Sequence, residues 1–201
     1  MRAIIVTHPT PNNIKDLIHL IEDDYVIGVD QAIKALIDQN IDIDLAVGDF
    51  DSLEDLDVLR DLDVIKLNPI KDITDSYQAL YEAEKRGYES LIMVGGFGGD
   101  RIEHFIAHLL HFNRFESLEM INEHSRITMK KEGEYTFSSQ CYISFFPYPE
   151  AIITLQGFKY PLDLYVLKLF DPLCISNELV LETGTLTVHQ GTVLVIESNK
   201  K

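Results

Sequence analysis

Hydrophobic and polar positions alternate in two different ways along the chain, and the change falls near Asn122. Upstream of it, short apolar runs are each followed by polar residues and then by a stretch with helical periodicity. Such alternation of strands and helices implies crossover connections between parallel strands. We therefore predict a mostly parallel, Rossmann-like α/β sheet with helices on both faces. The apolar runs are residues 25–29, 45–47, 64–67 and 90–94, and the expected helices are residues 32–37, residues 76–86 and one that begins near Arg101.

Downstream of Asn122 the pattern predicts mainly strands, separated by turn residues such as Gly157, Gly184 and Gly191. Short strands between turn signals are typical of a small antiparallel β-sandwich. We therefore predict two domains, an α/β domain over residues 1–122 and a β-sandwich domain over residues 123–201. The expected strands are residues 126–130, 134–137, 141–146, 152–155, 164–169, 186–189 and 192–196.

Composition and charge exclude several classes of protein. With 201 residues and 46% hydrophobic content, the chain can bury one good core, or a larger domain with a smaller companion. The net charge of −16 argues against a nucleic-acid partner, because phosphate backbones need a basic surface. No apolar stretch is long enough to span a bilayer, the first residues lack the zones of a signal peptide, and two cysteines are too few for a disulfide framework or a zinc site. We expect a soluble, cytoplasmic protein without a membrane partner.

The segment Gly48-Asp49-Phe50-Asp51-Ser52 follows the apolar run of residues 45–47. On extended backbone, side chains two residues apart point the same way, so Asp49 and Asp51 can both reach one cation while Phe50 turns into the fold. The alternative is a strand that ends in a turn, with Asp51 or Ser52 capping a helix over residues 53–59. This segment alone leaves both interpretations open.

Three more segments place polar chemistry after an apolar run. Asp30 follows residues 25–29, where a helix cap would also explain it. Asp72 and Asp75 precede the expected helix over residues 76–86, with Thr74 as its cap. The fourth segment, Gly95-Gly96-Phe97-Gly98-Gly99-Asp100-Arg101, has glycines that let backbone amides approach an anion and an arginine that can pair with phosphate. The same segment could also be no more than a flexible turn.

Ligands of parallel α/β sheets bind outside the carboxyl ends of the strands, so all four segments are expected at one edge. Many like charges in one place are unfavourable unless a cation lies between them. Hard oxygen ligands in an open cleft suit Mg²⁺, which is usually held by a few carboxylates together with water and nucleotide phosphate. The residues therefore predict a Mg²⁺-nucleotide site. Its expected members are Asp30, Asp49, Asp51, Asp72, Asp75 and Arg101.

Histidines 104, 108 and 111 fall at i, i+4 and i+7 of the helix expected after Arg101 and share one face of it. Such a face could in principle bind a transition metal. Its neighbours Phe105 and Leu109 indicate instead that the helix packs against a core. We expect core packing here, with His104 the imidazole in reach of a substrate.

These motifs together resemble bacterial thiamine pyrophosphokinase, also called thiamine diphosphokinase, over nearly the whole chain. Residues 48–52 are similar to that family's Gly-Asp-Phe-Asp-Ser signature, and residues 72–80 to its Asp-x-Thr-Asp-x-x-x-Ala-Leu element. Residues 98–104 are similar to its Gly-Gly-Arg-x-Asp-His stretch. In the second part, residues 157–162 and Ser176-Asn177-Glu178 resemble the elements that shape the thiamine pocket. From spacing alone, residues 176–178 would be only a polar turn.

The resemblance implies Mg²⁺-dependent transfer of the pyrophosphoryl group of ATP to the hydroxyl of thiamine, giving thiamine diphosphate and AMP. It also implies a homodimer in which each thiamine pocket is shared between subunits. The expected catalytic residues are Asp49, Asp51, Asp75 and Arg101, and the first three of them are the expected Mg²⁺ ligands. The expected ATP-binding residues are Asp72, Thr74, Gly98, Gly99, Arg101 and His104. The expected thiamine-binding residues are Asp30, Ser176, Asn177, Glu178 and Tyr160.

The chain departs from the family pattern at several positions. Glu103 stands where the family has Asp, His108 where an Asn is expected, and Asp100 where a Gly is expected. The chain has no Trp to stack on thiamine, and the aromatic residues that could replace it, unless the partner subunit does so, are Tyr160, Phe158 and Tyr165. Two other interpretations stay open: a γ-phosphoryl kinase for a small alcohol, and a non-catalytic sensor of Mg²⁺-nucleotide or thiamine diphosphate.

Overall fold

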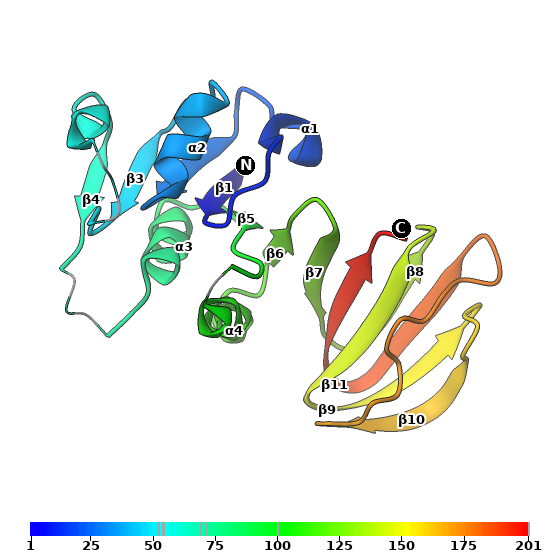
Figure 1. Cartoon of the computed structure of the whole chain (residues 1–201). Helices are drawn as coiled ribbons and strands as arrows, with labels where there is room; N and C mark the ends of the chain where they lie inside the picture. The colour runs from blue at the N-terminus through cyan, green and yellow to red at the C-terminus, as the bar shows by residue number, and fades with distance from the viewer. Residues whose placement is uncertain (52, 54, 69, 71, 100, 201) are drawn as a thin grey trace. The chain divides into compact units, whose positions relative to one another are not determined.

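The computed structural model describes residues 1–51, 53, 55–68, 70, 72–99 and 101–200, which divide into two compact units, Met1–Glu123 and His124–Lys201 (Figure 1). Ser52 and Asp100, which belong to two of the sequence motifs, lie outside the described residues. Each unit has its own hydrophobic core. The fold is β-rich, with few helices among the residues described.

The strands of the first unit pair in parallel in the order β4-β3-β2-β1-β5-β6. The chain runs outward from β1 to β4 and then returns to place β5 on the other side of β1, and ligands of open parallel sheets bind at such reversals. The sequence interpretation missed β1 and β6, although residues 3–6 are fully buried apolar residues. The strands are β1 (Arg2–Thr7), β2 (Tyr25–Val29), β3 (Leu45–Gly48), β4 (Val64–Lys66), β5 (Ser90–Gly95) and β6 (Leu118–Ile121).

Helix starts in the first unit agree only in part with the predicted caps. Thr74 caps α3 as predicted, because its hydroxyl accepts a hydrogen bond from the Tyr77 N–H. Asp30 does not cap α2, since Gln31 takes that position without a side-chain bond. The helix expected over residues 53–59 is a single 3₁₀ turn, η1, which Asp55 caps in place of Asp51. The helical segments are α1 (Ile14–Ile18), α2 (Ala32–Asp38), η1 (Leu56–Leu59), α3 (Asp75–Lys85), α4 (Ile102–Leu110) and η2 (His111–Asn113).

Apolar side chains on the helices pack against the parallel sheet. Ile14 of α1 and Leu36 of α2 pack in one cluster with Ile4 of β1. Helix α3 contacts β1, β2, β3 and β5. Phe50 is 4% exposed and packs with Ile33, so the prediction that it turns into the fold is confirmed.

The second unit is antiparallel, with strand order β10-β9-β11-β7 and β8 also paired to β11. Two predicted breaks are wrong: residues 141–146 and 152–155 belong to one strand, β9, and residues 186–189 and 192–196 to another, β11. The pairing of β9 and β11 shifts register on either side of Gly191, so bulges bend the strands where a turn was expected. The strands are β7 (Ser125–Lys130), β8 (Gly133–Phe137), β9 (Tyr142–Gln156), β10 (Leu162–Lys168) and β11 (Gly184–Ser198).

Aromatic rings fill the core of the second unit. Phe137, Phe145 and Phe158 meet edge to face, with ring centroids 5.5 to 6.2 Å apart. Cys141 and Cys174 are both buried and free, as small apolar residues would be. Within the described ranges, no helix is long and apolar enough to cross a membrane.

Candidate active site

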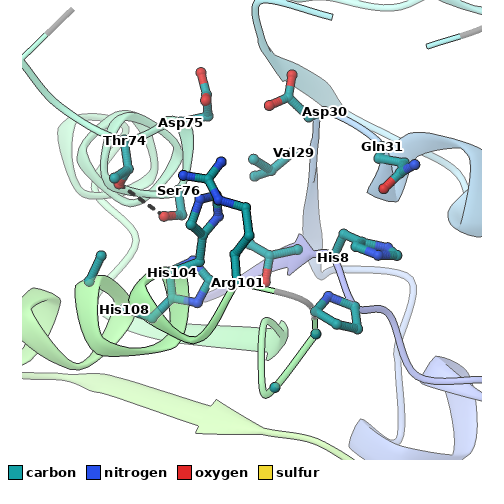
Figure 2. Close-up of a pocket in the computed structure, with 15 residues that line it drawn as sticks. His8, Val29, Asp30, Gln31, Thr74, Asp75, Ser76, Arg101, His104 and His108 are labelled. Carbon is teal, nitrogen blue, oxygen red and sulfur yellow. Dashed lines mark hydrogen bonds between the residues drawn. The ribbon is translucent and has the colours of Figure 1, made fainter. Parts of the chain in front are cut away.

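A cleft of about 460 Å³ lies at the carboxyl edge of the parallel sheet, where β1, β2 and β5 end (Figure 2). This is the edge at which the strand order reverses. The starts of α3 and α4 complete the walls. The lining residues are Thr7, His8, Pro9, Val29, Asp30, Gln31, Thr74, Asp75, Ser76, Gly98, Gly99, Arg101, His104, Ala107 and His108.

The cleft brings together part of the predicted site. Predicted residues that line it are Asp30, Thr74, Asp75, Gly98, Gly99, Arg101 and His104. Asp49, Asp51 and Asp72 are not among its lining residues. The sequence interpretation did not include Thr7 and Ser76, which also line the cleft. Thr7 could have been found, because it directly follows the apolar residues 3–6, as the other site residues follow apolar runs.

Opposite charges face one another across the cleft. The carboxylates of Asp30 and Asp75 lie on the same side in Figure 2, and the guanidinium of Arg101 extends toward them. Arg101 Nε also donates a hydrogen bond of 2.9 Å to Glu103 Oε1, and both side chains are exposed. The pKa of Glu103 is lowered by a hydrogen bond from its own backbone N–H and by Arg101. Glu103, at the position where an Asp was expected, thus forms an exposed ion pair with the arginine of the cleft.

Asp30 connects the cleft to the turn that carries Asp49 and Asp51. Its Oδ1 accepts a hydrogen bond of 3.1 Å from the Phe50 N–H, and its own N–H donates to the Val47 carbonyl at 3.1 Å. Asp30 and Phe50 both have left-handed backbone conformations, with φ of 46° and 61°. Such conformations cost about 1 kcal/mol or more each and persist only where surrounding contacts hold them. A Cβ on Gly48 would lie 1.9 Å from Asp30 Oδ1, so only glycine leaves room for this carboxylate.

Two of the three histidines on the α4 face are buried, His108 in the wall of the cleft and His111 behind Ser76. His108 Nδ1 lies 3.1 Å from the Gly96 carbonyl oxygen, and His111 Nε2 lies 3.0 Å from Ser76 Oγ. Burial lowers the pKa of both imidazoles, for His111 to about 4. No group of three or more metal-binding side chains occurs among the described residues, here or elsewhere. The face therefore packs against the core, as expected, and exposed His104 lines the cleft.

Acid should destabilise the fold through His111. Between pH 6.5 and about 4 the unfolded chain binds a proton at this imidazole and the folded chain does not, so the free energy of unfolding falls as the pH falls. The contribution of His111 reaches about 3 kcal/mol near pH 4. Urea denaturation at a series of pH values measures it. The variant His111→Gln should lose about that much of the pH dependence, and a slope equal to that of the wild type would contradict the prediction.

The predicted thiamine segment of the second unit is held by its own hydrogen bonds. Asn177 is 1% exposed; its Oδ1 accepts from the N–H groups of Tyr160 and Glu178, and its Nδ2 donates to the Tyr160 carbonyl. Glu178 pairs with Lys200 at 2.7 Å and Lys159 at 3.1 Å, and these two partners, Lys200 foremost, lower its pKa. Asn177 therefore fixes the loop that presents Tyr160 and Glu178.

Among the aromatic residues considered for stacking, Tyr160 has the most accessible ring. It is 59% exposed, and the Lys159 ammonium lies 5.7 Å from its ring centroid. Phe158 is 3% exposed and belongs to the core, and Tyr165 is half-buried with its hydroxyl bonded to Asp171. Of the three, Tyr160 is the one placed to meet a ligand.

Both units match known families in sequence. Residues 18–122 match the family model "Thiamin pyrophosphokinase, catalytic domain", and residues 124–193 match "Thiamin pyrophosphokinase, vitamin B1 binding domain". The chain is 33% identical over 214 residues to the thiamine pyrophosphokinase of Bacillus subtilis (strain 168), a similarity that covers 98% of this chain and 99% of that protein.

Solved structures agree with the sequence comparison. The crystal structure of thiamine pyrophosphokinase from Bacillus subtilis has a TM-score of 0.85 at 30% identity, covering all of both chains. That of thiamin pyrophosphokinase from Geobacillus thermodenitrificans has a TM-score of 0.83 at 30% identity, covering 100% of this chain and 99% of that one. A β-rich fold of two units with a charged cleft at a parallel sheet edge, matched by such relatives, defines an enzyme of the transferase class. The chain belongs to the thiamine pyrophosphokinase family.

Proposed function

We propose that this chain transfers the pyrophosphoryl group of ATP to the hydroxyl of thiamine, giving thiamine diphosphate and AMP. The observation that carries the proposal is the cleft at the strand reversal, where Asp30, Asp75 and Arg101 meet in a member of this family. The hydroxyl oxygen attacks the β-phosphorus of ATP, and the bond between that phosphorus and the oxygen of the α-phosphate breaks. AMP leaves with the electron pair of that bond, and the hydroxyl proton passes to a carboxylate of the cleft.

The cleft residues serve this reaction mainly by position and charge. In-line attack requires both substrates to be held in one geometry, and charge on the triphosphate must be offset. We assign Arg101 to the phosphate oxygens, and Gly98 and Gly99 to close approach of the loop backbone, since both glycines line the cleft with φ of 72° and 84°. Thr74 and Asp72, at the start of α3, and His104 complete the proposed ATP site.

The donor set fits a Mg²⁺ ion that arrives with ATP. Mg²⁺ usually takes one or two protein carboxylates and completes its shell with water and phosphate. A preassembled group of three ligands, absent among the described residues, is therefore not required. We propose that one or two of the carboxylates of Asp75 in the cleft and Asp49 and Asp51 on the adjoining turn ligate the ion, with water and phosphate at its other positions. When bound, the ion neutralises charge on the triphosphate.

For thiamine we propose Asp30 in the first unit and Ser176, Asn177, Glu178 and Tyr160 in the second. Thiamine carries a positive thiazolium ring, which carboxylates attract and an exposed aromatic ring can stack on. Asn177 contributes by holding the loop, and a direct contact from its amide stays a prediction.

We propose that the first unit supplies the nucleotide site on a Rossmann-like sheet with helices on both faces. The packing of α1 and α2 around Ile4 and Val6 of β1, and the contacts of α3 with the same sheet, support this proposal. The second unit binds thiamine and forms a homodimer, for which exposed apolar side chains such as Leu164, Phe170 and Ile175 offer contact area. We also propose a cytoplasmic location, where ATP is supplied.

Identifying both products tests the function. Purified protein incubated with thiamine, ATP and Mg²⁺ should release AMP and thiamine diphosphate in equal amounts, resolved by chromatography. Omission of thiamine is the control for plain ATP hydrolysis. ADP with thiamine monophosphate would instead establish a γ-phosphoryl kinase, and unconsumed ATP with retained nucleotide binding would establish a sensor.

A further inference from the structure

Two buried imidazoles at the end of α4 contact two separate walls of the cleft. His108 is 7% exposed and His111 is 4% exposed, and their ring centroids are 5.7 Å apart. One is bonded to the loop that follows β5, and the other to the first turn of α3. The pair thus joins elements that are distant in sequence.

His108 fixes the start of the glycine loop. A carbonyl oxygen only accepts, so the 3.1 Å contact to the Gly96 oxygen requires the proton on Nδ1 of His108. Gly96 has a φ of 76°, and a Cβ there would lie 2.6 Å from this Nδ1. The Gly96 N–H donates to the Pro9 carbonyl at 3.0 Å, so both backbone groups of Gly96 are held. Gly98, Gly99 and Arg101 follow within five residues and line the cleft.

His111 fixes the start of α3 through a chain of hydroxyl groups. Its Nε2 lies 3.0 Å from Ser76 Oγ, which lies 3.1 Å from Thr74 Oγ1. Thr74 Oγ1 in turn accepts from the Tyr77 N–H as the helix cap. Ser76 and Thr74 both line the cleft, and Figure 2 shows the bond between them.

We propose that His108 and His111 are positioning residues for ATP. The two histidines hold the glycine loop and the first turn of α3 at the separation that the triphosphate needs. The proposal rests on the proposed function. It gives a role to His108, at the position where an Asn was expected, through its Nδ1–H bond to the Gly96 carbonyl. Neither histidine is assigned a contact with a reacting atom.

Substitutions at residue 108 test the proposal through separate constants for the two substrates. The variant His108→Leu leaves the Gly96 carbonyl buried without its donor, and the KM for ATP should rise about tenfold or more. The KM for thiamine should stay within about twofold, because the second unit, which carries all the proposed thiamine residues except Asp30, is unaffected. The variant His108→Asn retains an N–H donor and should restore the KM for ATP to within about threefold of wild type.

A binding measurement and a small variant make the test independent of turnover and of folding. Titration calorimetry measures the dissociation constant for ATP directly. This constant should be similar for wild type and His108→Asn and about tenfold higher for His108→Leu. Ser76→Ala removes the hydroxyl that contacts both His111 and Thr74, and it should weaken ATP binding about threefold to tenfold. Unchanged ATP binding in this variant would overturn the role of His111, even if His108→Leu does not fold.

The control is Asp24→Asn, which weakens the ion pair of this buried carboxylate with the partly exposed Arg2 at the opposite edge of the same sheet. It should lower the stability of the first unit and leave ATP binding unchanged. The proposal is overturned if this control weakens ATP binding as much as His108→Leu does, if His108→Asn fails to rescue, or if the constants for ATP and thiamine change together. A wild-type protein that forms no AMP would defeat the proposed function alone, since the calorimetry still tests whether the histidines position bound ATP.

Discussion

Replacing Asp75 with Asn should lower kcat about 100-fold to 1000-fold. Asp75 is the first residue of α3 and lines the cleft beside Asp30, where the substitution removes one negative charge and changes shape little. Loss of one preorganised electrostatic group costs about that factor when charge is redistributed in the transition state. The favourable interaction of a carboxylate with a helix amino terminus, which Asn lacks, contributes about 0.3–1 kcal/mol to stability, so the variant should still fold.

The rate of AMP release with saturating thiamine and ATP measures this effect. Asp57→Asn is the matched control, since it removes the same charge from an exposed position on η1 paired with Arg60. That control should keep turnover within about twofold. An Asp75→Asn protein with more than a tenth of wild-type kcat would remove Asp75 from the catalytic group, and the Mg²⁺ assignment with it.

Replacing Gly48 with Ala should lower kcat/KM about 100-fold while the protein still folds. The new Cβ would lie 1.9 Å from Asp30 Oδ1 and 2.7 Å from its Cγ, so the carboxylate has to rotate away. Rotation breaks the bond to the Phe50 N–H and releases the turn that carries Asp49 and Asp51. A displacement of about 1 Å in a positioned group can cost about 100-fold in rate. Thermal unfolding should report a loss of about 1–3 kcal/mol, the usual cost of overpacking.

A double-mutant cycle shows whether the effect runs through Asp30. In an Asp30→Ala background the clash is gone, so adding Gly48→Ala should change kcat/KM less than threefold. Gly28→Ala, which would meet Ile33 and Leu36 in the core at 2.9 and 3.1 Å, is the control for overpacking in the neighbouring strand without a clash against Asp30. It should lower stability with little change in kcat/KM. Additive losses at Gly48 and Asp30 would show that the two residues act separately.

Local sequence rules anticipated much of the secondary structure but not its breaks. The helix over residues 76–86 and its Thr74 cap were predictable, because a hydroxyl before an apolar period is a local signal. The long strands β9 and β11 were not, because Gly191 reads equally as a turn or as a bulge. Which one forms depends on the partner strand, and a Cβ at Gly191 would lie 2.2 Å from the Glu150 carbonyl oxygen of that partner.

Motif spacing likewise anticipated only part of the cleft. Asp30, Asp75 and Arg101 each follow an apolar run, and parallel pairing of those runs brings them to one edge. Ser76 and His108 were not predicted as lining residues, because nothing local distinguishes them from core-facing residues of a helix. Their place depends on the bonds to His111 and Gly96, which join segments 35 and 12 residues apart.

By itself the sequence determined the family, the two-part pattern of elements and the edge of the sheet where the chemistry gathers, since these follow from residue order and periodicity. Only the tertiary structure decided what each side chain does there. It set Asp30 to hold the turn after β3 and not to cap α2, and it set Asn177 to fix a loop. It also buried His108 and His111, which lowers the pKa of both imidazoles. The physical reason is that hydrogen-bond partners and burial are properties of neighbours in space, which no local spacing specifies.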